Sequence, residues 1–303
     1  MRALVIGYGS IGARHARLLS ELGCATAVLS RRQVDFPNIY SDLASALAGH
    51  QPDYVVVANP TNLHYDTLRE LAVAGFAGRV LVEKPLFDRR LPIPVAGFRS
   101  VSVAYNLRFH PVIQRLRDLV ARENVLSVQA YVGQYLPDWR PGTDYRRSYS
   151  ASAGQGGGVL RDLSHELDYL GWLFGNWLAM TALGGRVSSL EIDSDDLYVL
   201  LMQTSRCPVV SVQVSYLDRV ARRRIVVNTE HHTLEADLVG GTVSVDGELE
   251  TFTVDRDFTY RQMHSAILRE DAAILCSIEE GAATLKLIEA VEQANQRKEW
   301  VIQ

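Results

Sequence analysis

MRALVIGYGSIG, residues 1–12, is the stretch that decides the fold of this chain. Leu4 to Ile6 form an apolar run typical of a short strand, and three glycines follow it at the spacing Gly-x-Gly-x-x-Gly: Gly7, Gly9 and Gly12. Residues 13–22 then have a helical pattern. A strand, a tight glycine turn and a helix form the context in which this spacing predicts a dinucleotide-binding turn.

Each glycine has a physical reason to be there. Gly7 permits the sharp turn, Gly9 lets the backbone approach a pyrophosphate, and Gly12 lets the helix lie close to the strand. The unpaired amides at the helix start face the phosphates, and the helix dipole favours their charge. The predicted cofactor contacts of the turn are Gly7, Tyr8, Gly9, Ser10, Ile11 and Gly12. The alternative is a glycine turn in a sheet that binds no ligand.

The bulk composition narrows the class of protein. A length of 303 residues suggests about two domains, and a net charge of −4 argues against a nucleic-acid-binding surface. The three cysteines, Cys24, Cys207 and Cys276, have neither pairing nor metal spacing, so we expect reduced thiols, no metal and a cytoplasmic location. No apolar run approaches the length of a membrane span, and the first strand begins at once, so we expect neither a membrane segment nor a signal peptide.

The end of the second predicted strand, residues 25–29, indicates which dinucleotide binds. An acidic residue there would accept a hydrogen bond from the ribose 2′-hydroxyl of NAD. This chain has Ser30, Arg31 and Arg32 instead, and guanidinium groups suit a 2′-phosphate. We therefore favour NADP(H) over NAD(H) as the cofactor. The alternative is that the two arginines are solvated loop residues.

Strands alternate with helices through the first hundred residues. Residues 54–58, 79–82 and 101–104 read as buried strands, and residues 41–48 and 62–74 as helices. This alternation predicts a doubly wound parallel sheet, whose ligands gather at the carboxyl ends of the strands. Gly7, Ser30, Asn59 and Lys84 all fall at such ends.

Four motifs in fixed order make a family resemblance visible. They are Gly7-x-Gly9-x-x-Gly12, Asn59-Pro60-Thr61-x-x-His64, Glu83-Lys84-Pro85, and Tyr105-Asn106-x-Arg108-Phe109-x-Pro111. Together they resemble the Gfo/Idh/MocA family of nicotinamide-dependent sugar and cyclitol oxidoreductases, and the resemblance covers essentially the whole chain.

The resemblance implies roles for individual residues. Lys84 matches a lysine that lies beside the nicotinamide and the substrate, and the Lys84-Pro85 peptide is expected to be cis. Further cofactor contacts are expected from Asn59, Pro60, Thr61, His64, Glu83, Asn106, Trp139 and Arg140. Substrate contacts are expected from Tyr105 and Arg108. The chain departs from the family at residues 86–100, where Pro92 and Pro94 forbid the usual regular helix.

An aromatic and basic loop follows a helix predicted at residues 109–122 and a strand at residues 125–132. Its residues 135–149 combine tyrosine and arginine with aspartate, which suits a hydroxylated, even charged, sugar ring. Tyr135 and Tyr145 are the predicted substrate contacts. The segment is similar to family members of bacterial surface-sugar or sialic-acid-type pathways. The alternative is a packed surface loop.

Residues 159–174 read as a helix with an apolar stripe on one side. The other side carries ionisable residues beside aromatic ones, so we infer that it faces a cleft: Arg161, Asp162, His165, Asp168, Tyr169 and Trp172. In the family an aspartate usually precedes a catalytic histidine by four residues. Here Arg161 stands four before His165 and Asp162 three before it, so which of the two partners the histidine stays open.

From residue 197 onward the pattern predicts an antiparallel sheet, one face of which could pair with a second subunit. Arg222, Arg223 and Arg224 read as solvated, and the pair His231-His232 lacks a third ligand at metal spacing. Helices at residues 260–276 and 282–296 and a last strand at 300–303 close the fold.

The predicted fold is an α/β Rossmann domain over residues 1–104 and an α+β domain with a large, mostly antiparallel open-faced sheet over residues 105–303. The second domain would bind substrate and form a homodimer or homotetramer through its sheet, with a C-terminal segment able to pack back on the first domain.

The predicted function is an NADP(H)-dependent oxidoreductase that acts on a secondary hydroxyl, or the matching ketone, of a small sugar-like substrate. Lys84, His165 and Asp162 would be catalytic, and Asp162, Arg161 and Asp168 would also lie at the substrate. Two alternatives stay open: a dinucleotide-binding regulator without turnover, and a redox-assisted glycosidase.

Overall fold

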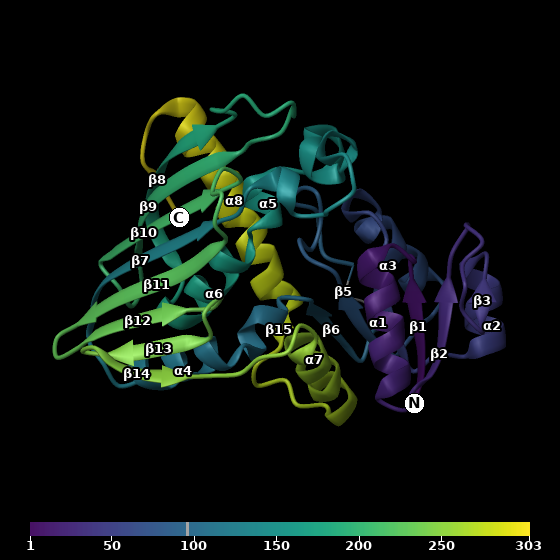
Figure 1. The fold of residues 1–303 in the computed structure, drawn as a ribbon. Helices are drawn as coiled ribbons and strands as arrows, with labels where there is room; N and C mark the ends of the chain where they lie inside the picture. Colours follow the sequence, from purple (N-terminus) through teal and green to yellow (C-terminus); the bar gives the residue numbers. More distant parts are fainter. Residues whose placement is uncertain (95–96) are drawn as a thin grey trace. The chain divides into compact units, whose positions relative to one another are not determined.

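The computed structural model describes residues 1–94 and 97–303, and the chain divides into two compact units (Figure 1). The first unit comprises residues 1–109 and 256–282, and the second comprises residues 110–255 and 283–303. The segment 256–282, far along the sequence, therefore belongs to the first unit.

A seven-stranded sheet forms the first unit, in the order β15-β6-β5-β4-β1-β2-β3. Every neighbouring pair is parallel except β15 with β6, which confirms the predicted parallel Rossmann sheet. The strands are β1 (Arg2–Ile6), β2 (Ala25–Leu29), β3 (Ile39–Tyr40), β4 (Tyr54–Val57), β5 (Arg79–Val82), β6 (Ser100–Val103) and β15 (Cys276–Ser277). The α-helices are α1 (Ser10–Glu21), α2 (Leu43–His50), α3 (His64–Val73) and α7 (Phe258–Arg269), with short 3₁₀ helices η1 (Thr61–Leu63) and η2 (Asn106–Phe109).

The core of this unit lies between β-strands and α7. Val5, Val56 and Leu81 of three neighbouring strands are fully buried, and Met263 and Ile267 of α7 join the same cluster. Burying such side chains contributes about 1.5–3 kcal/mol each. The segment 256–282 is thus part of the hydrophobic core that holds the parallel sheet.

The crossover between β5 and β6 contains no regular helix in its described part, residues 83–94 and 97–99. Val95 and Ala96, which also belong to the predicted shortened stretch, lie outside the described residues. Pro92 and Pro94 lack the amide hydrogens that a helix would need there.

The second unit is built on a nine-stranded sheet in the order β14-β13-β12-β11-β7-β10-β9-β8-β16. All neighbouring pairs are antiparallel except β10 with β7, so the prediction of a mostly antiparallel sheet is confirmed. The strands are β7 (Val125–Gly133), β8 (Trp177–Gly185), β9 (Leu197–Thr204), β10 (Val209–Ser215), β11 (Arg222–Thr229), β12 (Thr233–Asp237), β13 (Thr242–Val245), β14 (Glu248–Thr251) and β16 (Val301–Ile302).

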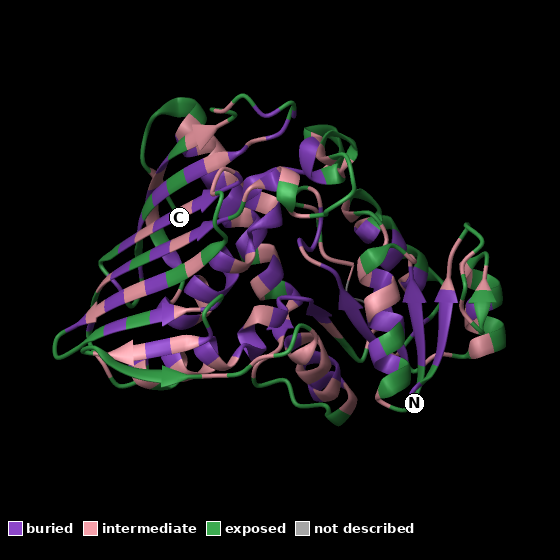
Figure 2. Cartoon of the chain, in the orientation of Figure 1, coloured by how far each residue is buried: buried purple, intermediate pink, exposed green. Residues whose placement is uncertain are grey.

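Burial alternates along the central strands of this sheet, as Figure 2 shows by colour. In β9, Leu200 and Met202 are buried while Val199 and Leu201 are exposed. Helices α4 (Pro111–Val120), α5 (Val159–Asp162) and α6 (His165–Phe174) belong to this unit, which also contains the 3₁₀ helices η3 (Leu136–Asp138), η4 (Tyr145–Arg147), η5 (Tyr149–Ala151) and η6 (Ala153–Gln155). Helix α8 (Ile278–Arg297) begins in the first unit and continues in the second.

The predicted continuous helix over residues 159–174 is wrong, because the structure breaks it into α5 and α6. Leu163 has a ψ of 25°, and the Glu166 amide donates to the Leu163 carbonyl, three residues back, at 3.3 Å. Asp162 and His165 therefore lie on two separate helical segments. They do not share one face of a single helix, contrary to the prediction.

Candidate active site

The glycine turn has the geometry that a bound pyrophosphate needs. A Cβ on Gly12 would lie 2.0 Å from the Gly7 carbonyl oxygen, and a Cβ on Gly7, whose φ is +96°, would lie 2.6 Å from the Asn59 nitrogen. A Cβ on Gly9 would meet no atom within 4 Å. Gly7 and Gly12 are thus needed to close the turn, whereas Gly9 leaves open space in front of the backbone.

The first turn of α1 is ready for an anion. No side chain of the described residues caps its amino terminus, and that turn contains no acidic residue. The first amide hydrogens of a helix have no partner within the helix, and here no capping side chain or first-turn carboxylate of the described residues competes with an anion for them. This cradle fits a dinucleotide pyrophosphate.

The end of β2 carries the predicted nucleotide-selecting residues. Ser30 Oγ accepts a hydrogen bond from the Arg32 amide at 3.1 Å, which folds the backbone into a tight turn. Both guanidinium groups, of Arg31 and Arg32, belong to exposed residues, and neither pairs with a carboxylate among residues 1–94 and 97–303. The Tyr8 ring lies edge-on to the ring of Phe36 in the same loop, with the ring centroids 5.9 Å apart.

The turn after β4 is fastened to the turn after β5 by His64. Its Nε2 lies 3.0 Å from the Asn59 carbonyl oxygen, and its Nδ1 lies 3.1 Å from the Leu86 carbonyl oxygen. Burial lowers the pKa of His64 against the opposing effect of these carbonyls. Both ring nitrogens face backbone, so we reinterpret His64, a predicted cofactor contact, as a residue that holds the two turns together.

Asn59 itself is placed to bind a ligand. Its Nδ2 donates to Thr67 Oγ1 at 2.8 Å, while its buried Oδ1 has no hydrogen-bond partner in the described part of the chain. A buried acceptor without a donor is costly, and a cofactor group could satisfy it. Pro60 and Thr61, the other predicted contacts, follow directly, with Thr61 at the start of η1.

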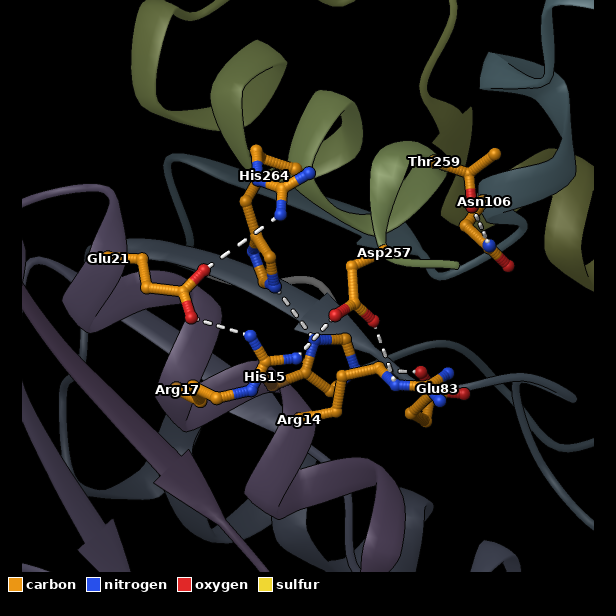
Figure 3. A network of polar contacts seen from close by, with 10 residues as sticks. Arg14, His15, Arg17, Glu21, Glu83, Asn106, Asp257, Thr259 and His264 are labelled. Carbon is orange, nitrogen blue, oxygen red and sulfur yellow. Dashed lines mark hydrogen bonds and ion pairs between the residues drawn. The ribbon is translucent and has the colours of Figure 1, made fainter. Parts of the chain in front are cut away.

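Lys84 and Glu83 follow β5 directly. Lys84 is half-buried, and its peptide with Pro85 is cis, as the motif predicts. Glu83, a predicted cofactor contact, is buried, and its Oε1 lies 2.8 Å from His15 Nε2 (Figure 3). Its Oε2 accepts the Lys84 amide hydrogen at 3.1 Å. The Glu83 side chain is thus turned into the protein.

The side chains of the motif at residues 105–109 are mostly buried and contact other parts of the first unit. Arg108, a predicted substrate contact, is 2% exposed, and its Nη1 lies 3.0 Å from Glu280 Oε2. Asn106, a predicted cofactor contact, donates from Nδ2 to Thr259 Oγ1 at 2.6 Å, and Tyr105 is also buried. Asn106 and Arg108 thus tie η2 to the segment 256–282.

In the second unit, Asp162 is held by two tyrosines. Tyr216 donates to its Oδ2 at 2.5 Å, and Tyr149 donates to its Oδ1. Desolvation, followed by the Asp162 charge, raises the pKa of both tyrosines well above the ordinary value. A Cβ on Gly157 would lie 2.0 Å from the Tyr149 carbonyl oxygen, so the glycine run lets Tyr149 lie against α5.

Part of the aromatic loop packs around the same cluster. Trp139 lies edge-on to the Tyr216 ring, with centroids 5.1 Å apart. The Arg219 guanidinium lies 3.4 Å from the Tyr135 ring centroid, a cation–π contact. Tyr145 accepts the Glu191 amide hydrogen at 3.3 Å, and Arg140 is exposed. Trp139 is therefore brought to the Asp162 cluster, whereas the Tyr145 hydroxyl binds backbone.

The remaining predicted residues lie on or near α6. His165 is half-buried at the first position of α6, and Asp168 is buried one turn later. Arg161 ion-pairs with Glu292 of α8 at 2.5 Å. Arg161 thus links α5 to α8.

Sequence reasoning missed several residues of these clusters. Nothing near Tyr216 in the sequence marks it, because its partner lies 54 residues away. Arg223 was expected to be solvated, but its Nε lies 2.8 Å from the fully buried Glu166 carboxylate. His15 was passed over although it lies on α1, five residues past the helix start; a histidine on an otherwise apolar helix face was the available signal.

No group of three or more possible metal ligands occurs among the described residues. A search of the same residues for helices long and apolar enough to cross a bilayer finds none.

Comparisons with known proteins identify the family. A model described as an oxidoreductase family with an NAD-binding Rossmann fold matches residues 1–91, and a model of the Gfo/Idh/MocA C-terminal domain matches residues 113–235. The chain belongs to the Gfo/Idh/MocA family, as its four ordered motifs predict.

Curated relatives match parts of the chain. An uncharacterized oxidoreductase of Synechocystis sp. is 30% identical over 148 residues, covering 46% of this chain and 39% of that protein. The D-apiose dehydrogenase of Paraburkholderia graminis is 27% identical over 240 residues, which cover 73% of this chain and 58% of that protein. The D-xylose 1-dehydrogenase (NADP(+)) 2 of Haloferax volcanii is 33% identical over 115 residues, which cover 35% of this chain and 34% of that protein. The matched part thus spans only 34% to 58% of these relatives' own lengths.

The fold is also similar to solved structures. The WlbA dehydrogenase from Bordetella pertussis, crystallised with NADH and UDP-GlcNAcA, superimposes with a TM-score of 0.83 at 19% identity. The match covers 100% of this chain and 97% of that one. At this identity the likeness shows the shared fold alone.

Proposed function

We propose that the protein is an NADP(H)-dependent oxidoreductase that transfers a hydride between the nicotinamide and a secondary hydroxyl or ketone of a sugar-like molecule. One observation carries the proposal: four neighbouring parallel strands, in the order β5-β4-β1-β2, end in candidate cofactor and catalytic groups. These groups are Lys84, Asn59, the glycine turn, and Ser30 with Arg31 and Arg32. Ligands of doubly wound sheets bind at this edge.

The dinucleotide assignment is supported by the open space at Gly9, the uncapped amides of α1 and the unsatisfied Oδ1 of Asn59. The preference for NADP(H) is supported by the two guanidinium groups after β2, which lack carboxylate partners in the described structure. A charge-assisted hydrogen bond contributes about 1.5–3 kcal/mol, so one contact to a 2′-phosphate changes affinity about 10- to 150-fold.

The catalytic roles follow from chemistry. When bound, the nicotinamide takes up or donates the hydride. In the oxidative direction, the Lys84 ammonium group holds the substrate oxygen and stabilises its developing negative charge, and His165 accepts the hydroxyl proton. Asp162 supports the site through its carboxylate, and Tyr149 and Tyr216 fix that carboxylate in place.

A sugar-like substrate is supported by the D-apiose and D-xylose dehydrogenases among the relatives. Trp139 beside Tyr216 and Arg219 over Tyr135 provide apolar faces and donors of the kind that sugar rings use. A role in bacterial surface-sugar metabolism and a cytoplasmic location belong to the same proposal; three buried free cysteines agree with the latter.

We further propose that the protein forms a homodimer or homotetramer through the large sheet. The outward side chains Leu183, Val199 and Leu201 of β8 and β9 are 65%, 42% and 41% exposed. Neighbouring exposed apolar residues of this kind mark association surfaces. Light scattering on the full chain is expected to give a mass of two or four chains, and a monomer would contradict this assembly.

The test of the function is a paired titration with NADPH and NADH, followed by a panel of sugar alcohols and ketosugars at the nicotinamide absorbance. We expect tighter NADPH binding and turnover of at least one sugar. NADPH binding without oxidation or reduction of any sugar would favour the regulator. Release of a free sugar from an added glycoside, without net cofactor consumption, would favour the glycosidase.

A further inference from the structure

A buried row of four polar side chains in the first unit has no part in the function proposed above. Figure 3 labels three of the four, His15, Glu83 and His264. Tyr54 OH lies 3.0 Å from His264 Nδ1, and His264 Nε2 lies 2.8 Å from His15 Nδ1. His15 Nε2 lies 2.8 Å from Glu83 Oε1. Tyr54, His15 and His264 are each 0% exposed.

The four groups come from distant parts of the sequence. Tyr54 belongs to β4, His15 to α1 and His264 to α7, and Glu83 directly follows β5, next to Lys84. The row therefore connects the helix that begins at the glycine turn to the turn that carries the lysine.

Hydrogen-bonding capacity fixes the direction of the row. Each neutral imidazole has one N–H donor and one acceptor nitrogen. If Tyr54 donates to His264 Nδ1, then His264 donates from Nε2 to His15 Nδ1, and His15 donates from Nε2 to the Glu83 carboxylate. Every polar hydrogen in the row then has an acceptor, and Glu83 needs no proton.

The reverse direction is less favourable. It would require His264 to carry its hydrogen on Nδ1 and to donate to Tyr54, which would leave the Tyr54 hydroxyl hydrogen without this acceptor. An unsatisfied buried donor costs about 1–3 kcal/mol. A charged His15 would require the same tautomer of His264 and is disfavoured for the same reason.

The surroundings agree with a neutral His264 ring. Burial lowers the pKa of His264 well below its ordinary value and raises the pKa of Tyr54 well above its ordinary value. The Tyr260 ring lies edge-on to the His15 ring, with the ring centroids 5.5 Å apart. The Arg14 guanidinium lies 5.1 Å from the Tyr260 ring centroid. Among the described residues, Glu83 is the only carboxylate in direct contact with Tyr54, His264 or His15.

We propose that Tyr54, His264 and His15 form an oriented hydrogen-bond chain that fixes the Glu83 carboxylate and, through it, the Lys84 backbone, so that His15 and His264 are positioning residues for the lysine. Glu83 has one oxygen on His15 and the other on the Lys84 amide, so it joins the chain to the turn. The positioning role rests on the proposed function; the direction of the chain does not.

Histidine tautomers give the first test, by ¹⁵N NMR of the full chain, with His15→Gln and His264→Gln used for assignment. We expect both rings of the wild type to be neutral with the hydrogen on Nε2. Glu83→Gln replaces an acceptor by an amide that can donate to His15, and this should move the hydrogen to Nδ1 in both rings. A wild-type His264 with its hydrogen on Nδ1, or a His264 unaffected by Glu83→Gln, would overturn the oriented chain.

The positioning role is tested with His264→Phe, which keeps a ring but removes both nitrogens. Hydrogen exchange of the Lys84 amide is expected to accelerate, because His15 loses the donor that orients it and therefore holds Glu83 less firmly. With a sugar that the wild type turns over, kcat should fall about 10- to 100-fold, because a small displacement of a reacting group slows the chemical step by this much. The Kd for the dinucleotide should stay within about threefold of the wild-type value. Unchanged exchange and an unchanged kcat would contradict the role.

Ile267→Ala is the matched control, since Ile267 is a buried α7 residue of the same core without polar contacts. It should lower the melting temperature and leave both kcat and Lys84 exchange unchanged. A matching loss of kcat in this control would show that the effect is general destabilisation and would overturn the role. If the wild type turns over no sugar, the proposed function fails, while the tautomers and the exchange still decide the chain.

Discussion

The substitution Gly9→Ala separates ligand binding from folding in the glycine turn. Gly9 has φ −80° and ψ −170°, which alanine adopts readily, and a Cβ there meets no protein atom within 4 Å. The folded protein should therefore accept the methyl group, with a stability unchanged or raised by up to about 1 kcal/mol. The same methyl group would stand where the pyrophosphate approaches the backbone.

Displacing the pyrophosphate by a methyl radius would break at least one amide-to-phosphate hydrogen bond. Such a charge-assisted bond contributes about 1.5–3 kcal/mol, so we expect NADPH affinity to fall about 10- to 150-fold. Thermal melts and an NADPH fluorescence titration measure the two effects on one sample.

Gly12→Ala is the matched comparison. Its Cβ would lie 2.0 Å from the Gly7 carbonyl oxygen, so the start of α1 must move away from the turn. This variant should lose stability as well as affinity. Wild-type NADPH affinity in Gly9→Ala would refute the placement of the pyrophosphate on this turn.

Three further predictions follow from the site. Arg31→Ala and Arg32→Ala should each weaken NADPH binding about 10-fold or more and leave NADH binding unchanged, which paired titrations measure; equal losses for both cofactors would contradict the 2′-phosphate assignment. Lys84→Met should abolish turnover in the absorbance assay while NADPH still binds, and retained turnover would remove the lysine from catalysis. Burial, and then the Arg223 charge, lower the pKa of His110 to about 4. In the unfolded state this histidine binds its proton near pH 6.5. As the pH is lowered from 6.5 to about 4, the free energy of unfolding should therefore fall by about 1.4 kcal/mol per pH unit. His110→Asn keeps a side-chain acceptor at the start of α4 and should lose this dependence in urea melts, and an identical pH profile in both proteins would contradict it.

Local sequence patterns predicted the elements whose geometry is decided locally. The glycine spacing predicts a turn in which Gly7 and Gly12 admit no Cβ, and the structure shows that close packing. Pro92 and Pro94 predict that no regular helix forms between β5 and β6, and the described residues of that crossover contain none. In such places backbone sterics act within a few residues, so the sequence alone carries the information.

Long-range contacts decided what the patterns could not. Arg108 lies in a motif that suggests a ligand contact, yet its ion-pair partner Glu280 is 172 residues away. The helix predicted at residues 159–174 breaks near Asp162, whose carboxylate binds Tyr149 and Tyr216 from other segments. An apolar stripe at helical spacing continues through such a break, because the stripe reflects burial and not backbone continuity.

Short edge strands were missed for a similar reason. β3 and β15 contain two residues each, and their pairing with β2 and β6 is set by the sheet edge and not by their own composition. Strand β8, with nine residues, was also missed, because the predicted sheet was started only at residue 197. Its alternating burial becomes clear only once β9 is placed beside it.

The central claim is that Lys84 and His165 act on one substrate oxygen beside the nicotinamide. The most direct measurement is a crystal structure of the protein with an NADP(H) cofactor and a sugar that it turns over. The account predicts the Lys84 Nζ and a ring nitrogen of His165 each about 3 Å from the same sugar oxygen, with the nicotinamide C4 facing the carbon that bears it. A sugar oxygen in contact with only one of the two groups, or a cofactor bound away from Gly9, would contradict it.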